Sequence, residues 1–358
     1  MKINRHGEKK TIISNPYGTH KFFAWPSVVR LQNGKIAVGA SGFRLSHVCP
    51  FGKSVLSFSE DNGETYTAPA PIIDTPLDDR DAGLCTFGES GLIITSFNNT
   101  RPAQRLVMNN CSTYDYRDAY LGMITDEIEE KYFGATFRIS YDCGVTFGEL
   151  HMSPITSPHG PIELKNGKIL WVGHPQTDSA HPIEDKRIRA YELNLDGSME
   201  YLGVIDDVYV DGKKRVPYEP HTVELESGRL LCIFRIEPHM TMFSTYSDDG
   251  GKTWSEPVRL LDDNGGAPPH ILKHSSGALV CLYGRRSAPI GIRAMFSYDD
   301  GETWDKDHVV CPLEGSPDIG YPASIELENG EILTVFYAPC KENGAAVIMQ
   351  QKWSFEKD

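Results

Sequence analysis

Long apolar runs are missing from this chain of 358 residues. A helix that crosses a bilayer needs about eighteen or more consecutive apolar residues, and no stretch of the sequence reaches that length, so we expect no membrane partner. The opening residues, MKINRHGEKKTIIS, also lack the apolar centre of a secretory signal. The sequence therefore predicts a cytoplasmic protein, or a secreted one if a leader has been removed.

Basic residues and closely spaced cysteines are scarce as well. The chain has 35 Lys and Arg against 49 Asp and Glu, a net charge of −14. A nucleic-acid surface needs a basic patch, so we expect no nucleic-acid partner. The 8 cysteines contain no C-x-x-C pair and no other metal-ligand spacing. We therefore expect reduced thiols, no metal site and no cofactor.

The composition that remains is that of a globular protein rich in turns. Hydrophobic residues make up 40% and charged residues 23%, which are ordinary globular values. The 33 glycines and 23 prolines favour many tight turns over long helices. The length suffices for a large core, and we interpret residues 1–358 as one domain.

One hairpin pattern recurs six times along the chain. Each copy has an apolar run that alternates with polar residues, a polar turn that ends in glycine, and a second alternating run. Successive copies begin 49 to 76 residues apart, which is the spacing of propeller blades. A single unit of this kind cannot bury both faces, so the copies should close into a ring. They span residues 25–40, 82–97, 158–173, 219–234, 268–283 and 321–336.

A second motif, S-x-D-x-G-x-T followed by an aromatic residue, occurs four times. The copies begin at Ser59, Ser140, Ser247 and Ser297. We interpret each as the turn between the outer strands of a blade, with Asp capping the amides of the turn, Gly at positive φ and the aromatic ring packed inward. The carboxylates do not have the spacing of a calcium loop.

These motifs resemble the Asp boxes, or BNR repeats, of the sialidase superfamily, and the resemblance covers nearly the whole chain. It implies an all-β fold, a six-bladed β-propeller with Asp-box turns. The third blade has only the degenerate turn NLDGSM, and the sixth has no box. We expect the N-terminal TIISN to supply the outer strand of the sixth blade and so to close the ring.

One helical insertion, at about residues 99–138, interrupts the second blade. Within it, residues 119–133 have helical periodicity. We interpret the insertion as a lid that brings Arg101 and Arg105 to the site; a decoration or an oligomer contact is the alternative. The sequence does not predict the oligomeric state. The apolar stripe of the helix would consist of Leu121, Ile124, Ile128 and Tyr132.

Titratable and aromatic residues recur where the first strand of each hairpin begins and the second ends. Folding a hairpin about its glycine brings these two points together, as for Glu219 and Arg235. The same alignment puts Tyr321 and Ala82 level with Glu219. Convergence of such groups at one mouth of a ring is typical of a binding or active site. The other candidates are Trp25, Arg44, His174, His221, His270, Arg286 and Tyr337.

The resemblance implies roles for several of these residues. Sialidases use a tyrosine nucleophile assisted by a glutamate, an aspartate acid/base, and three arginines that hold the substrate carboxylate. Tyr321 matches the nucleophile, Glu219 the assisting glutamate and Arg235 one arginine. Arg286 or Arg293 matches another, and the sequence does not decide between them. A carboxylate beside a phenol can take its proton and so activate it.

Two parts of the family pattern are absent. Trp25 stands where the first arginine belongs, and the loop LSHVCPFG after Arg44 has no aspartate. His47 in that loop is the available acid/base, and Asp79 or Asp81 could serve from the next blade. We therefore expect an exo-acting glycosidase that is related to the sialidases but not specific for sialic acid, and that cleaves a terminal and possibly acidic sugar from a small glycan or glycoside.

Two other functions stay open. His47, His174, His221 and His270 all map near the same mouth, and a neutral-range histidine suits acid/base chemistry. A histidine-dependent lyase or glycosidase acting on uronic acids is one alternative. The second is a carbohydrate-binding propeller without turnover, which would rely on aromatic stacking by Trp25 and Tyr337.

Overall fold

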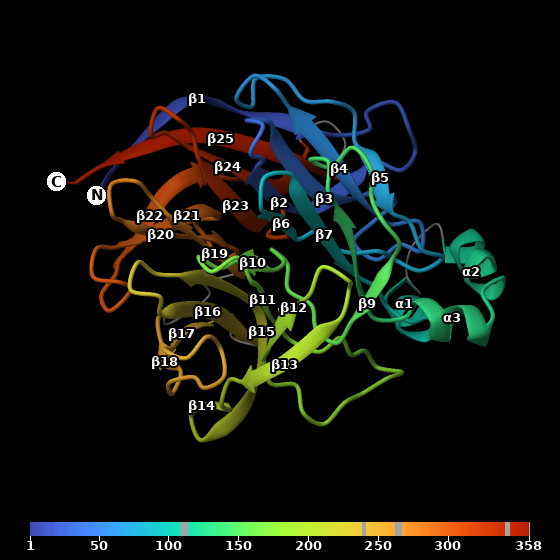
Figure 1. Ribbon diagram of the computed structural model, residues 1–358. Helices are drawn as coiled ribbons and strands as arrows, with labels where there is room; N and C mark the ends of the chain where they lie inside the picture. Colours follow the sequence, from blue (N-terminus) through green and yellow to red (C-terminus); the bar gives the residue numbers. More distant parts are fainter. Residues whose placement is uncertain (109–113, 238–240, 262–266, 341–343, 358) are drawn as a thin grey trace.

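The chain folds into six antiparallel sheets arranged as the blades of a propeller, which confirms the predicted fold class (Figure 1). The computed structural model describes residues 1–108, 114–237, 241–261, 267–340 and 344–357. Within these residues the only helices are the three short ones of the insertion in the second blade.

The strands of the first three blades follow the chain in sheet order. Blade one contains β2 (Phe22–Arg30), β3 (Ile36–Arg44), β4 (Lys53–Ser59) and β5 (Ala70–Ile73). Blade two contains β6 (Leu84–Phe87), β7 (Gly91–Phe97), β8 (Ala135–Ser140) and β9 (His151–Ser153). Blade three contains β10 (Ile162–Glu163), β11 (Ile169–Gly173), β12 (Arg189–Leu193) and β13 (Met199–Val204).

Blades four and five continue in the same way, and blade six takes one strand from the other end of the chain. Blade four contains β14 (Val208–Val210), β15 (Lys213–Glu224), β16 (Leu230–Glu237), β17 (Thr241–Ser247) and β18 (Val258–Arg259). Blade five contains β19 (Ala267–Lys273), β20 (Leu279–Arg285), β21 (Gly291–Ser297) and β22 (Asp305–Pro312). Blade six contains β23 (Gly320–Glu326), β24 (Ile332–Pro339), β25 (Ala346–Glu356) and β1 (Lys2–Ile13).

The ring is closed by the N-terminal strand, as the sequence predicts. β1 pairs antiparallel with β25 from Lys2, opposite Glu356, to Ile13, opposite Ile348. β1 begins before the predicted segment TIISN, residues 11–15, and ends inside that segment at Ile13. The two termini therefore lie beside each other at the outer edge of blade six (Figure 1).

Apolar cores lie between the blades rather than within them. Six clusters of buried side chains each join two neighbouring blades, such as Val38 of blade one with Val335 of blade six. Phe137 of blade two likewise packs with Trp171 of blade three. Each blade therefore depends on both neighbours for its core, and this holds the inner strands at fixed positions around the central channel.

The Asp boxes adopt the turn that the sequence predicts. In the box at Ser297, the backbone N–H and hydroxyl of Thr303 donate to Asp299 at 2.9 and 2.5 Å. The Ser297 hydroxyl donates to the same carboxylate and accepts from the N–H of Gly301, whose φ is +89°. These bonds lower the pKa of Asp299 to about 2. The Trp304 ring packs on the core between blades four and five.

The insertion contains three helices, so the single helix predicted over residues 119–133 is wrong. They are α1 (Arg101–Met108), α2 (Tyr114–Gly122) and α3 (Asp126–Tyr132), and residues 109–113 lie outside the described part. The predicted helix is divided because α2 ends at Gly122 and Thr125 caps α3, accepting from the N–H of Ile128. The predicted stripe still packs on one side of the insertion, with Leu121 and Ile124 buried there.

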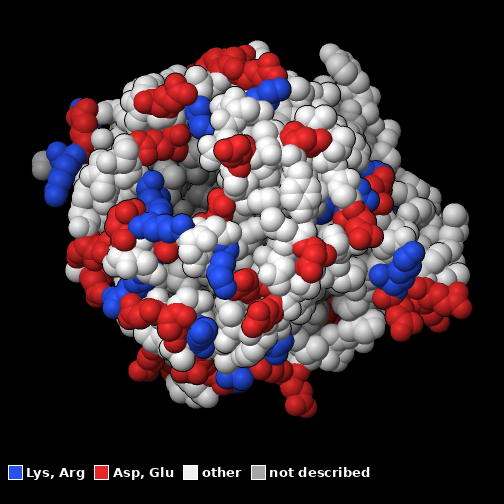
Figure 2. All heavy atoms as spheres, in the orientation of Figure 1, with Lys and Arg blue, Asp and Glu red and all other residues white. Residues whose placement is uncertain are grey.

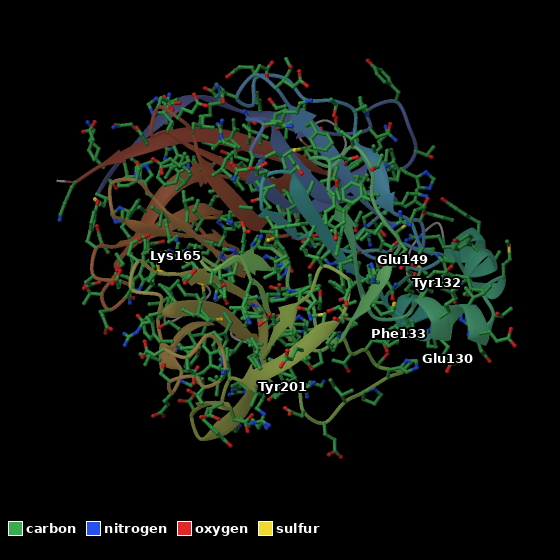
Figure 3. The ribbon with its side chains drawn as sticks, viewed as in Figure 1. Glu130, Tyr132, Phe133, Glu149, Lys165 and Tyr201 are labelled. Carbon is green, nitrogen blue, oxygen red and sulfur yellow. The ribbon has the colours of Figure 1, made fainter. Side chains whose placement is uncertain are left out.

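The insertion lies at the edge of the ring and returns to β8 through Tyr132 and Phe133 (Figures 1 and 3). The guanidinium of Arg117 is buried and donates to the Ser46 hydroxyl and the Val48 carbonyl, both at 2.9 Å. The insertion therefore braces the loop after β3, which contains His47. None of these described helices is long and apolar enough to cross a membrane.

Candidate active site

One extra residue in the inner strand of five blades shapes the mouth of the channel. Between Tyr218, opposite Arg235, and His221, opposite Ile233, β15 advances three residues while β16 advances two. The same bulge occurs where β2, β19 and β23 begin, and between the Arg80–Phe97 bridge and Leu84 in blade two. Bulges re-aim side chains and are common beside active sites.

The bulges put non-glycine residues into the left-handed backbone region. Trp25, Asp81, Glu219 and Tyr321 have φ of +54°, +56°, +52° and +50°. This conformation costs about 1–3 kcal/mol for each such residue and is concentrated at functional sites. Alignment on the turn glycines put Ala82 at the position of blade two. The structure corrects this to Asp81, because the first strand of blade two reaches its turn one residue later.

Three of the predicted site residues form one hydrogen-bonded chain. The Tyr321 hydroxyl donates to Oε1 of Glu219, and Nε of Arg235 donates to Oε2 of the same carboxylate. Burial works to raise the pKa of Glu219, but the charge and hydrogen bond of Arg235, with the bond from Tyr321, hold it below its usual value. Burial and the Glu219 charge raise the pKa of Tyr321 well above that of a free phenol. The pair is a neutral phenol beside a carboxylate ready to take its proton.

Asp81 completes this cluster from blade two. Its side chain is buried, and its charge acts on Tyr321 and Glu219. Burial, reinforced by the Glu219 charge and opposed by Arg80, raises the pKa of Asp81 to about 7. A carboxyl group with this pKa carries its proton up to neutral pH, as a general acid must.

Asp79, the other aspartate proposed from this segment, is held differently. Its carboxylate accepts from the N–H and hydroxyl of Thr75 at 2.6 and 2.8 Å and is fully buried. Burial raises its pKa to about 7 as well. These bonds give Asp79 a structural role at the start of the segment that carries Asp81.

Trp25 forms an aromatic wall of the cluster. The guanidinium carbon of Arg80 lies 4.1 Å from the ring centroid, and the rings of Tyr321 and Tyr337 lie 6.4 and 6.1 Å away. Only 1% of Trp25 is exposed. Its indole therefore fills space beside Tyr321 with an apolar surface rather than with a positive charge.

A second hydrogen-bonded chain adjoins the first. Nη2 of Arg286 donates to the Tyr337 hydroxyl at 2.9 Å, and that hydroxyl donates to Asp318 at 2.7 Å. Asp318 also bonds Nδ1 of His47 at 3.1 Å. Burial lowers the pKa of His47 against the effect of this bond. The guanidinium of Arg286 lies 6.0 Å from the centroid of the Tyr321 ring, so the two chains are neighbours.

Two predicted substrate-binding arginines are occupied by other groups of the protein, although the Arg44 guanidinium also lies 4.9 Å from the centroid of the Trp25 ring. Arg44 is completely buried; its guanidinium donates to Asp78 at 2.5 Å, to the Ser41 hydroxyl and to backbone carbonyls. Arg293 donates to the Pro289 carbonyl and lies 3.8 Å from Asp307. Both arginines are engaged by the protein, and Arg286 rather than Arg293 lies at Tyr321.

The expected lid arginines are engaged as well. Arg101 donates to Glu129 and to Asp126, and Arg105 donates to Asp118 at 2.5 Å. All of these pairs are internal to the insertion. A lid role for the insertion stays a prediction.

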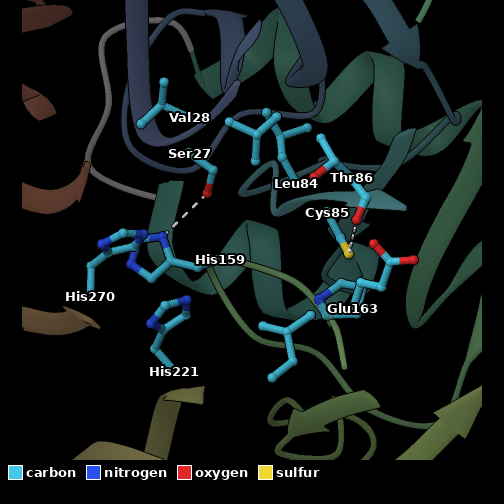
Figure 4. A pocket seen from close by; sticks show the side chains of 12 residues that line it. Ser27, Val28, Leu84, Cys85, Thr86, His159, Glu163, His221 and His270 are labelled. Atoms are coloured by element: carbon cyan, nitrogen blue, oxygen red, sulfur yellow. Dashed lines mark hydrogen bonds between the residues drawn. The ribbon is translucent and has the colours of Figure 1, made fainter. Parts of the chain in front are cut away.

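The predicted histidines separate into two groups. His174 lies near the first chain, where its ring is 5.3 Å from that of Tyr218 and burial lowers its pKa. His221 and His270 lie deeper in the channel with a third histidine, His159, at ring separations of 4.5 to 5.3 Å (Figure 4). These three line a cavity with Ser27.

Hydrogen bonds assign the tautomers of two channel histidines. Nδ1 of His221 accepts the N–H of Ile271 at 2.9 Å, so its proton is on Nε2. The Ser27 hydroxyl donates to the Pro158 carbonyl and accepts from Nδ1 of His159, leaving Nε2 of His159 as an acceptor. Burial lowers the pKa of His221 to about 3. The cavity thus presents neutral imidazoles. Among the described residues, no three His, Cys, Asp or Glu side chains are grouped to hold a metal ion.

Comparison with known proteins agrees with the fold. The family described as the BNR repeat-like domain matches residues 133–334, more than half of the chain. The chain belongs to this family. No curated protein sequence matches it.

Solved structures resemble this BNR-repeat protein along its length. A protein of unknown function from Dyadobacter fermentans is 21% identical, with a TM-score of 0.77 over 99% of both chains. The intramolecular trans-sialidase from Ruminococcus gnavus is 14% identical, with a TM-score of 0.65 over 97% of both. An α-L-arabinofuranosidase from Fusarium graminearum is 12% identical, with a TM-score of 0.65 over 97% of this chain and 98% of that one. At these identities the likeness is one of fold.

Sequence reasoning missed five residues of this BNR-repeat site, among them the channel histidine His159. Asp318 and Glu237 bond Tyr337 and Arg235, and Arg80 covers Trp25. Tyr218 packs on His174. A usable signal existed for three of them: Asp318 lies three residues before Tyr321, Glu237 two after Arg235, and Arg80 one before Asp81.

Proposed function

We propose that the protein is a glycoside hydrolase that releases a terminal sugar from a small glycan or glycoside. The observation that carries the proposal is the hydrogen-bonded chain of Tyr321, Glu219 and Arg235, and burial of the nearby Asp81, which raises its pKa to about 7, supports it. The likeness to structures named as a trans-sialidase and an arabinofuranosidase supports it at the level of fold.

In the first step, the Tyr321 oxygen attacks the anomeric carbon while Glu219 takes the phenolic proton. The hydrogen bond between the two groups is already formed. The high pKa of Tyr321 means that the phenol stays neutral until attack, so Glu219 is needed as the base. Asp81 gives its proton to the departing oxygen as the glycosidic bond breaks.

In the second step, water displaces Tyr321 from the anomeric carbon. Asp81, now ionised, takes a proton from that water, and Glu219 returns the phenolic proton to Tyr321. Two displacements at one carbon give net retention of configuration. Arg235 orients Glu219 throughout, because its Nε holds the carboxylate oxygen that faces away from Tyr321.

The proposal predicts that Tyr321→Phe loses turnover and keeps the fold. We expect kcat on an activated aryl glycoside to fall by about a thousandfold or more, as for loss of a nucleophile. Tyr201→Phe is the matched control because Tyr201 is half exposed on β13 (Figure 3). Rates and thermal unfolding would be compared for both variants. A fully active Tyr321→Phe enzyme would exclude this nucleophile.

A mass measurement addresses the covalent step directly. A 2-fluoro glycosyl fluoride of a hydrolysed sugar should add one glycosyl unit to the wild-type chain, on the peptide that contains Tyr321. Growth of an unsaturated, ultraviolet-absorbing product would instead indicate a lyase. Ligand-induced thermal stabilisation without turnover on any glycoside would indicate a binding protein.

A further inference from the structure

The positive charges of the site are already matched by acidic side chains. Nε of Arg235 donates to Glu219 and its Nη1 donates to Glu237. Two carboxylates therefore share one guanidinium. A ligand carboxylate that approached Arg235 would meet a group whose charge is already more than balanced.

Arg286 is also paired with a carboxylate, and Arg80 is held by other groups of the protein. Arg286 donates to the Tyr337 hydroxyl, which donates to Asp318, and its guanidinium lies 4.0 Å from that carboxylate. Arg80 lies 3.5 Å from Asp78, which Arg44 also engages, donates to the His47 carbonyl at 2.7 Å and is directed at the Trp25 ring. In the part of the chain that the structure describes, the two arginines nearest Tyr321, Arg235 and Arg286, thus each have a carboxylate of the protein beside them already.

The acidic groups are also more exposed than the arginines. The side chains of Glu237 and Asp318 are 38% and 37% exposed, whereas those of Arg235 and Arg286 are 8% and 21% exposed. An anionic sugar would meet the two carboxylates before either guanidinium. Like charges in contact disfavour a wrong ligand strongly enough to set specificity.

We infer that the terminal sugar bound at this site is uncharged, and that Glu237 and Asp318 exclude acidic sugars. The inference rests on the proposed function. Nη2 of Arg235 and Nη1 of Arg286 have no hydrogen-bond partner among the described residues. They are suited to donate to sugar hydroxyls.

The test pairs hydrolysis with binding. Wild-type protein would be assayed on aryl glycosides of neutral pentoses and hexoses, of glucuronic acid and of sialic acid. Folded Tyr321→Phe protein would be titrated calorimetrically with the free sugars. We expect a neutral sugar to be bound and released, with kcat/KM for the acidic glycosides lower by about a hundredfold or more.

Variants identify the excluding residues. Glu237→Gln and Asp318→Asn should each raise kcat/KM for an acidic glycoside relative to the neutral one by about tenfold, because each removes a like charge. Glu328→Gln is the control, since Glu328 is 84% exposed on the β23–β24 turn, remote from these groups. Unchanged ratios in both site variants would refute their role.

The outcomes separate this inference from the proposed function. Preferred hydrolysis or binding of an acidic sugar would overturn the inference and leave the glycosidase intact. Binding of neutral sugars with no turnover would support the inference and refute the glycosidase. Failure to bind or hydrolyse any sugar of the panel would overturn both.

Discussion

At the scale of single residues, the site depends on an unfavourable backbone conformation that tertiary structure stabilises. Glu219 and Tyr321 both have φ near +50°, and each is followed by a proline. The neighbouring blades supply the packing that keeps them there. The left-handed conformation of these two residues thus lowers the free energy of unfolding by a few kcal/mol and directs both side chains to one point.

Asp81 gives the protein a predicted pH profile. Its pKa is raised to about 7, so the protonated fraction, and with it the general acid, declines above neutral pH. We expect kcat/KM to fall about tenfold per pH unit on the alkaline side. Asp81→Asn should lose this alkaline decrease of kcat/KM. It should also slow the hydrolysis of glycosides with poor leaving groups far more than the hydrolysis of those with good leaving groups.

Asp79→Asn is the control for that profile. Asp79 has a similarly raised pKa, but its carboxylate is occupied by Thr75. We expect this variant to be less stable in thermal unfolding while the alkaline limb stays in place. If the alkaline decrease of kcat/KM disappeared in Asp79→Asn and persisted in Asp81→Asn, the titrating group would be Asp79 and not Asp81.

At the scale of elements, the Asp boxes and the hairpins were predictable because their patterns are local. A serine, an aspartate and a threonine within seven residues suffice to form the turn at Asp299. The bulges were not predictable in this way. Asp81 and Ala82 differ by one position, and only the pairing of β6 with β7 decides which residue lies at the mouth.

The boxes also predict acid sensitivity. Hydrogen bonds from the box lower the pKa of Asp142, Asp249 and Asp299 to about 2. The folded pKa lies below the unfolded value, so this stabilisation is present above about pH 4 and is lost as pH falls towards 2.

We therefore expect the thermal unfolding temperature to decrease across that window. Asp299→Asn should start from a lower value and should depend less steeply on pH there. Asp248→Asn is the control, because Asp248 pairs with Arg229 and takes no part in the hydrogen bonds of the box. Its pH dependence would show how much of the slope comes from surface carboxylates in general. Equal slopes for wild type and Asp299→Asn would argue against the boxes as the source.

At the scale of the whole molecule, the ring, its closing strand and the chain of Tyr321, Glu219 and Arg235 followed from the sequence, but the partners of other arginines did not. The six hairpins and TIISN predict the closure that β1 makes. Arg44 and Arg293 were assigned to the substrate by position, yet Asp78 and Asp307 engage them. Distant partners of this kind are set by loop paths that have no local pattern.

The closing strand carries a prediction of its own. Deleting residues 1–13 should lower the unfolding temperature strongly, because blade six loses its whole outer ladder and the buried Ile13. Deleting only residues 1–6 removes the outer half of the pairing, opposite residues 352–356, and should cost much less. Calorimetry of both variants would measure this. Equal, small losses would mean that the ring does not rely on β1.

Because the bulge is repeated, several blades present a side chain to the mouth of the channel from an equivalent backbone position. Trp25, Asp81, Glu219 and Tyr321 stand on different blades, but the same local backbone directs each of them. A functional group can therefore be supplied from one blade instead of another without redesign of the ring. Chemistry and selectivity in such a protein can be reprogrammed by exchanging single side chains at these points, with the cores between the blades left untouched.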